Sequence, residues 1–330
     1  MTRLLRAELR RFRSRRLVIV ALLVAVAGVG LITWGTWQTA RPLTGGALAA
    51  AQSNYDAAVR DWEENGEEIM AGCLEEQERV REAEGDPTLD FGCETMEPQR
   101  EWYFPEPVTF VDSSRLALSG TAYLLAFAAL LAGTTGTAAD LSSGGTSTWL
   151  TFEPRRGRVY TSKLSAIGLS LVLPTVLLVA ASVAGLMLLY RSGGLGTALT
   201  GDQTGDLASM AARVLALVVA AGVAGAALGM VMRHTAAVLG AVVGYLVAVE
   251  AVLGNAWSTA RPWMVLTNIE AWLDGPASYY VTTCTSTAQG TSCDWVEREV
   301  STGHGAVYLA VLVVVAVVLG LLTFRRRDAA

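Results

Sequence analysis

Six long apolar runs divide the chain into membrane-spanning and water-exposed parts. Each holds about twenty residues with few charges, the length of helix that crosses a hydrocarbon core of about 30 Å. Because a spanning segment must satisfy its own backbone hydrogen bonds, we expect helices in these runs. The sequence therefore predicts an all-α polytopic membrane protein with six transmembrane helices. Their predicted ranges are 17–37, 116–139, 164–190, 208–232, 235–254 and 307–324.

The first apolar run has an alternative interpretation as a signal peptide. Basic residues precede it, and Ala47, Ala49 and Ala51 offer small-residue cleavage sites. However, residues 17–37 are longer than the apolar core of a signal peptide. We therefore expect an uncleaved span.

Residues 1–16 combine many arginines with apolar residues at helical spacing. Leu5, Leu9 and Phe12 share one face of a helix, and most of the arginines lie on another. A basic amphipathic helix of this kind lies in the plane of the lipid headgroups with its apolar face toward the membrane. The sequence predicts such a helix on the cytoplasmic side, leading into the first span.

The polar segment 140–163, between the second and third spans, determines the predicted orientation. Its bases outnumber its acids, so the positive-inside rule places it in the cytoplasm. The arginine-rich tail 325–330 follows the sixth span on the same side, which makes both termini cytoplasmic. Within the segment, an amphipathic stretch that ends at a proline predicts a short surface helix followed by a basic turn. The charged residues are Asp140, Glu153, Arg155, Arg156, Arg158 and Lys163.

The predicted outer loop 38–113 is strongly acidic. From residue 56 to residue 112 it holds eighteen Asp or Glu against four Arg. Residues 47–84 lack proline and favour one or two helices, which end at the Gly85, Asp86, Pro87 sequence. We interpret the acids as solvated surface rather than as a cation or substrate site.

The second outer segment, residues 255–304, contains an alternating polar and apolar pattern. This pattern predicts two short strands around a turn at residues 288–290. Residues 262–273 precede the strands and favour a helix lying flat on the membrane surface.

All four cysteines fall in these two predicted outer segments. Their absence from the spans and the inner segments indicates disulfides formed in an oxidising compartment. Sequence order favours Cys73 with Cys93 and Cys284 with Cys293, although four cysteines allow three pairings. A zinc site is the competing reading, but the segments contain no CxxC and only one histidine, so no metal is predicted.

Two charged residues lie inside the apolar runs. Arg213 and Glu250 both fall roughly 6 to 8 Å below the predicted outer boundary, at 1.5 Å per residue. The hypothesis is an intramembrane ion pair; the alternative is that each side chain extends separately to the headgroups.

Small residues one helical turn apart mark the fourth and fifth spans. Gly225 and Gly229 in the fourth, and Gly240 and Gly244 in the fifth, have GxxxG spacing. Such spacing lets helix backbones approach closely, so both faces are candidates for helix contacts within or between subunits.

Composition and motifs exclude several function classes. The chain is 52% hydrophobic and 17% charged, whereas soluble domains are about a quarter charged. It has no GxxxxGK[ST] phosphate loop, no GxSxG elbow and no HExxH helix. No basic surface interleaved with aromatics indicates nucleic acid. We therefore expect no enzyme activity, no directly bound cofactor and no nucleic-acid partner.

The string GGTSTWLTFEPRRGRVYTSKL between the second and third spans resembles the cytoplasmic coupling segment of exporter-type ABC transporter permeases, the type-2 family. In that family an acid precedes Gly-Thr, a hydrophobic helix, a proline followed by arginine, and a lysine that opens the next span. The matching positions are Asp140, Gly145, Thr146, Trp149, Leu150, Pro154, Arg155, Arg156, Arg158 and Lys163. Together with Glu153, they are the predicted ATPase-coupling residues. The basic helix 1–16 is similar to the connecting helix of that family.

The resemblance implies a permease that uses ATP through a separate ABC ATPase subunit docked on the coupling segment. It also implies a second permease, identical or different, and export of a substrate across the plasma membrane. A topology signal alone would equally explain the three arginines after the proline. The alternative function is a non-transporting membrane protein whose acidic outer loop is a sensor or assembly surface.

Overall fold

The computed structural model describes residues 2–85, 87–142, 151, 155–287 and 290–326. Within these ranges six helical segments are long and apolar enough to cross a membrane, as predicted. They belong to α2 (Arg16–Ala40), α5 (Phe110–Ser142), α7 (Arg156–Ser192), α8 (Gly201–Met232), α9 (Thr235–Tyr245) and α12 (Thr302–Arg326).

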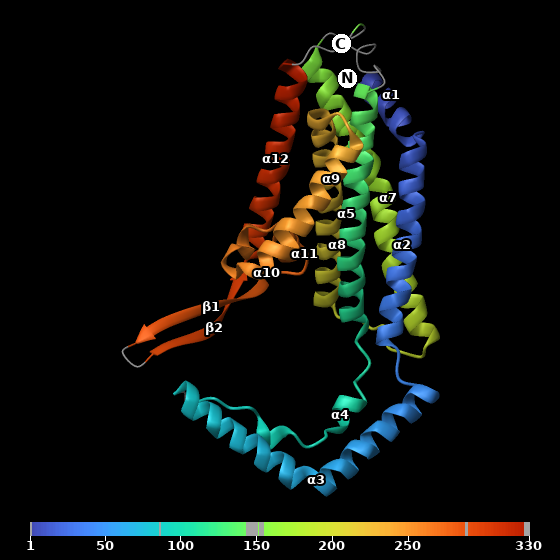
Figure 1. Ribbon diagram of the computed structural model, residues 1–330. Helices are drawn as coiled ribbons and strands as arrows, with labels where there is room; N and C mark the ends of the chain where they lie inside the picture. Colours follow the sequence, from blue (N-terminus) through green and yellow to red (C-terminus); the bar gives the residue numbers. More distant parts are fainter. Residues whose placement is uncertain (1, 86, 143–150, 152–154, 288–289, 327–330) are drawn as a thin grey trace. The chain divides into compact units, whose positions relative to one another are not determined.

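The chain forms two compact units. One contains residues 1–38 and 110–330, and the other contains residues 39–109. In the first unit, the short helix α1 (Thr2–Arg13) lies at the same end of the helix bundle as the last turn of α12 (Figure 1). Arginines of α1, α7 and α12 gather at this end, together with Arg233 after α8. We call it the basic end.

The close crossing of α5 and α8 holds the centre of the bundle together. A Cβ atom added to Gly133 would lie 2.0 Å from the backbone oxygen of Gly222, and one added to Gly225 would lie 2.1 Å from that of Leu130. Thr134 Oγ1 donates to the Gly225 carbonyl across the crossing, at 3.0 Å. The predicted helix contact of the fourth span is therefore present within the subunit. By contrast, no atom lies within 4 Å of a Cβ added to Gly240 or Gly244 in α9.

Two spans differ from their predicted form. The fourth begins at Gly201 rather than at residue 208, because Thr200 and Gln203 form a capping box that lets the polar residues 201–206 join the helix. The fifth is α-helical only to Tyr245 and continues as a π-helix, Leu246–Leu253. Wider turns of this kind are often found at functional sites.

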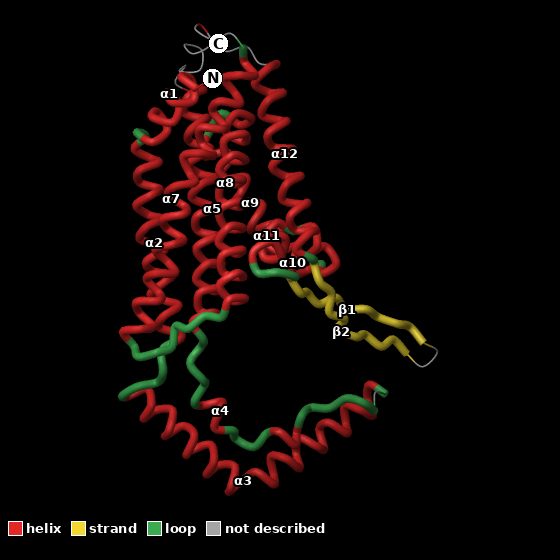
Figure 2. Tube along the Cα trace, turned by 180° about the vertical axis from the view of Figure 1, so that it is seen from behind, coloured by secondary structure: helices red, strands yellow, loops and turns green. Residues whose placement is uncertain are grey.

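The segment after the fifth span forms short helices and a hairpin. α10 (Gly254–Ala256) and a 3₁₀ helix (Ser258–Trp263) precede α11 (Val265–Leu273). Strands β1 (Ala277–Thr287) and β2 (Gly290–Val300) pair antiparallel, as predicted, although at eleven residues each they are longer than expected. The hairpin extends from the α10 and α11 region (Figure 2), and the Cys284–Cys293 disulfide joins opposed residues of its strands.

The second unit is built on one long helix. α3 (Gly46–Glu84) ends at Gly85, whose φ of 70° is the left-handed conformation that glycine adopts without a Cβ penalty. The predicted helix 47–84 and its stop signal are thus confirmed. A 3₁₀ turn (Cys93–Thr95) and α4 (Arg100–Tyr103) follow.

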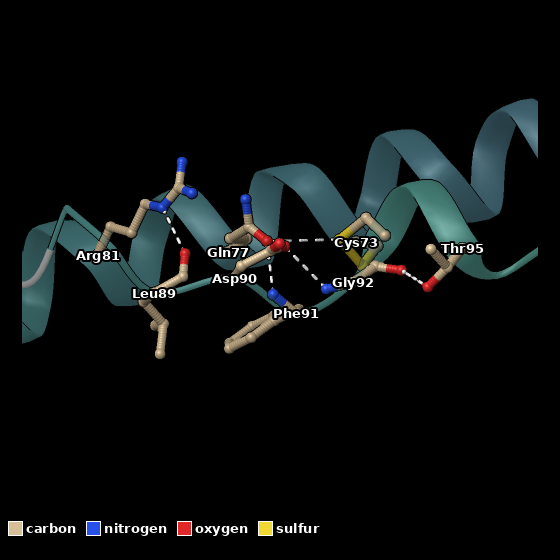
Figure 3. The surroundings of a disulfide bond; sticks show 9 residues. Cys73, Gln77, Arg81, Leu89, Asp90, Phe91, Gly92 and Thr95 are labelled. Carbon is tan, nitrogen blue, oxygen red and sulfur yellow. Dashed lines mark hydrogen bonds between the residues drawn. A yellow bond between two sulfur atoms is a disulfide. The ribbon is translucent and has the colours of Figure 1, made fainter. Parts of the chain in front are cut away.

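The chain after α3 runs back along this helix and contacts it at regularly spaced residues. Cys73, Gln77 and Arg81 recur every four residues, so they share one helix face, and each holds a residue of the returning segment (Figure 3). Cys73 is bonded to Cys93, Gln77 Oε1 accepts from the Phe91 amide at 2.7 Å, and Arg81 Nε donates to the Leu89 carbonyl at 2.7 Å. Four helical residues rise about 6 Å, nearly the length of two extended residues, about 6.6 Å. The two series therefore stay in register.

This arrangement predicts that the Cys73–Cys93 disulfide stabilises residues 39–109. Its cysteines are 20 residues apart, so the double variant Cys73→Ser/Cys93→Ser should lose about 3 kcal/mol and expose α3 to limited proteolysis. The double variant Cys284→Ser/Cys293→Ser is the control and should leave α3 protected. Equal protection of α3 in both variants would contradict the assignment, as would maleimide labelling of any cysteine before reduction.

Candidate functional site at the basic end

The two ends of the predicted coupling segment meet in the structure. Asp140 lies in the last turn of α5 and Lys163 in the second turn of α7. Their side chains form a direct ion pair, and each residue is only 2% exposed. The residues Gly145, Thr146, Trp149, Leu150, Glu153 and Pro154 lie outside the part of the chain that the structure describes.

Two residues of α1, Glu8 and Arg11, and Arg15 between α1 and α2 complete this ionic contact. Arg11 Nη2 lies 3.1 Å from Asp140 Oδ1, and Arg15 also pairs with that oxygen. Arg15 donates in addition to the Thr135 carbonyl at 2.9 Å. Glu8 Oε2 lies 3.5 Å from Lys163 Nζ. We call Glu8, Arg11, Arg15, Asp140 and Lys163 the Asp140 cluster.

Helical spacing brings the α1 members of the cluster together. Glu8 and Arg11 are three residues apart in α1, so they project from one side of the helix, and Phe12 lies beside them. Arg15 lies in the connection between α1 and α2. A Cβ atom at Gly136 of α5 would lie 3.0 Å from the Phe12 ring. A side chain at position 136 would therefore press on the Phe12 ring.

The structure corrects the predicted placement of α1. Its apolar residue Phe12 is buried in the protein with Tyr160, Ile167 and Met230, rather than facing lipid. Leu5 and Leu9 are half-buried. The sequence analysis did not single out Glu8. The available signal was that Glu8 is the only acid among the first sixteen residues. Its burial in the structure requires a cationic partner.

Burial makes the Asp140 cluster sensitive to the loss of any member. It contains three cationic and two anionic side chains, and removing one partner of a buried pair leaves an uncompensated charge. Glu8 Oε1 has no hydrogen-bond partner in the described part of the chain. A void of about 10 Å³ beside Glu8 and Lys163 is about the size of one water molecule. The cluster joins α1, α5 and α7 at the two ends of the predicted coupling segment.

A hollow lined by arginines lies next to the start of α7. Its volume is about 460 Å³, and its lining includes Arg155, Arg156, Arg158 and Arg325. Arg156 Nη1 donates to the carbonyls of Phe324 and Arg325 at 3.4 and 3.3 Å, so it binds the C-terminal turn of α12, where a cation is favoured. The side chains of Arg155 and Arg158 are exposed.

The predicted ion pair between Arg213 and Glu250 does not form in the structure. Arg213 Nη1 donates to the Leu273 carbonyl at the C-terminal end of α11, at 3.4 Å. Glu250 Oε1 accepts from the Leu266 amide at the N-terminal end, at 3.1 Å, and from Tyr245 Oη at 3.0 Å. The carboxylate and the guanidinium therefore occupy the two helix ends that their charges favour. The sequence predicts a similar membrane depth for the two residues, but it does not show that α11 lies between them.

Comparison with known protein families gives a match over nearly the whole chain. The sequence profile of the family described as "ABC-2 family transporter protein" matches residues 4–329. The match includes α1 from residue 4 onward, the Asp140 cluster and all six apolar spans. No curated protein matches the chain.

Proposed function

The chain belongs to the ABC-2 family of transporter proteins and is a transmembrane component of an ABC transporter, and we propose that its basic end receives force from a separate ATPase subunit. The observation that carries this proposal is the Asp140 cluster. It joins both ends of the segment 140–163 to α1, so a partner that pushes on this segment acts on three helices together.

Charge supports the proposed orientation and docking surface. Arginines of α1, α7 and α12 gather at the basic end, which the positive-inside rule assigns to the cytoplasm. Arg155 and Arg158 lie exposed at the hollow and present a positive surface. An acidic surface on the ATPase is its electrostatic complement.

The remaining parts of the proposal follow from the family. A second copy of this chain or a related permease completes the pathway, and ATP binding by the ATPases switches its access between the two sides of the membrane. The substrate is exported across the plasma membrane. The disulfide-bonded unit 39–109 and the hairpin then lie outside the cell, in the oxidising compartment that disulfides require.

Reversing the two exposed arginines tests the docking surface. We expect Arg155→Glu/Arg158→Glu to lower stimulation of the co-purified ABC ATPase about tenfold in proteoliposomes, because like charges then face each other across the contact. Thermal unfolding of the permease should not change, since both side chains are exposed.

The control variant is Arg191→Glu/Arg298→Glu, which reverses two exposed arginines far from the hollow. It should retain full stimulation. Unchanged stimulation in Arg155→Glu/Arg158→Glu would overturn the assignment of this surface. Failure of any ABC ATPase to co-purify with the chain from its native membrane would overturn the proposed function itself.

A further inference from the structure

A lateral cavity lies between the first three spanning helices, near the basic end. Its volume is about 350 Å³, within the range of sites for small ligands. α2, α5 and α7 supply most of its wall, with Phe12 and Arg13 of α1 and Val218 of α8 at its margins. The α2 residues that line it run from Val18 to Ala25, a distance of about 10 Å along the helix axis. The cavity therefore occupies the part of the bilayer just inside the headgroups.

One polar side chain in this apolar wall has no partner. Ser170 is only 5% exposed, and its Oγ makes no hydrogen bond within the described part of the chain. Four residues on, Pro174 lacks the amide hydrogen that would otherwise bond the Ser170 carbonyl. Both residues line the cavity. Uncompensated polar groups in a hydrocarbon environment are unfavourable, so the wall offers a hydrogen-bonding position to whatever occupies it.

A positive charge lies at the margin of the same cavity. Arg13 is exposed, lines the cavity, and has no ion-pair partner in the ranges that the structure describes. The members of the Asp140 cluster are paired with one another, whereas the described residues provide no acid that pairs with Arg13. The site thus combines an apolar cavity, a buried hydroxyl and a cation at its headgroup end.

We propose that this cavity binds one acyl chain of an anionic glycerophospholipid taken from the surrounding leaflet. The lipid phosphate is held by Arg13, the chain fills the space along α2, and the Ser170 hydroxyl donates to an ester carbonyl of the lipid. A bilayer component is the occupant that the site favours, because the cavity lies at bilayer depth and leucine and alanine side chains dominate its wall. This inference concerns a lipid site within one subunit and does not depend on an ATPase.

The test uses the full chain in phosphatidylcholine vesicles that contain a small fraction of phosphatidylglycerol with a photoreactive acyl chain. After irradiation, peptide mass spectrometry locates the labelled residues. We expect labelling to saturate and to concentrate on α2 residues 18–25 and α7 residues 170–178. Ala21→Phe fills the cavity and should reduce this labelling at least fivefold. Ala27→Phe is the matched control, because Ala27 is an exposed residue of α2 outside the cavity, and it should not change the labelling.

A second pair of variants tests the recognition of charge. Arg13→Gln should lower the preference for photoreactive phosphatidylglycerol over photoreactive phosphatidylcholine about fivefold. Arg10→Gln, an exposed residue of α1 outside the cavity, should leave the preference unchanged. Labelling spread evenly over the lipid-facing sides of α2 and α12, and unaffected by Ala21→Phe, would show that the cavity holds no bound chain and would overturn the proposal. A chain bound without preference for the anionic headgroup would overturn the role of Arg13.

Discussion

Replacing Asp140 with asparagine is expected to lower the free energy of unfolding by about 3–5 kcal/mol, because three cationic side chains then surround a neutral amide. Arg11, Arg15 and Lys163 all pair with the Asp140 carboxylate, which is almost completely buried. Glu8 would remain as the sole anion of the cluster. The loss should appear as a lower thermal unfolding midpoint in nanodiscs and as lower abundance in the membrane.

An exposed pair provides the control for this prediction. Arg115 and Asp206 lie 3.2 Å apart with side chains 49% and 63% exposed. Surface pairs of this kind contribute at most about 1 kcal/mol, so Asp206→Asn should change stability little. Equal effects of Asp140→Asn and Asp206→Asn would contradict the importance of the buried cluster.

A charge swap distinguishes the five-residue cluster from an isolated ion pair between Asp140 and Lys163. In Asp140→Lys/Lys163→Asp, opposite charges still face each other between α5 and α7. However, the lysine at position 140 then faces Arg11 and Arg15, so the swap should not restore stability. Restoration to the wild-type midpoint would show that α1 contributes nothing to the contact.

Gly133→Ala is the second change for which we expect a large effect. The new methyl group would lie 2.0 Å from the backbone oxygen of Gly222, and a backbone atom cannot move aside as a flexible side chain can. The α5 and α8 helices must separate. We expect this to lower the free energy of unfolding by about 3 kcal/mol or more. Gly225→Ala should behave in the same way, because its methyl group would meet the Leu130 carbonyl. Thermal unfolding of the reconstituted chain measures both effects.

The glycines of α9 are the natural control. Gly240→Ala and Gly244→Ala meet no atom within 4 Å, and alanine favours a helix over glycine. Both variants should therefore leave stability unchanged or raise it slightly. If they destabilise the isolated subunit as much as Gly133→Ala does, the close crossing of α5 and α8 is not what holds the bundle together.

Local signals allowed much of this fold to be predicted from the sequence. A proline-free stretch predicts α3 to within one residue of its observed start, and the Gly-Asp-Pro sequence predicts where it ends. An alternating polar and apolar pattern around a turn predicts the hairpin, and sequence order favours its disulfide. Six apolar runs indicated six helices. In each case a few neighbouring residues determine the structure.

The failures have a common cause, which is contact between residues far apart in the chain. Glu8 joins Lys163 across 155 residues, and nothing near Glu8 in the sequence indicates that partner. Arg213 and Glu250 were paired by depth alone, whereas α11 lies between them. The two GxxxG motifs are equivalent in sequence, yet only that of α8 packs against another helix of this chain. The pattern of neighbouring residues does not determine which distant segments come into contact.

Site-specific photocrosslinking in native membranes can show whether a separate ATPase binds the basic end between α5 and α7. A photoreactive residue replaces Thr151, an exposed position in the predicted coupling segment, or Ala198, an exposed position between α7 and α8 far from the basic end. We expect an ABC ATPase to crosslink to position 151 and not to position 198. Absence of an ATPase at position 151, or equal crosslinking at both positions, would contradict it.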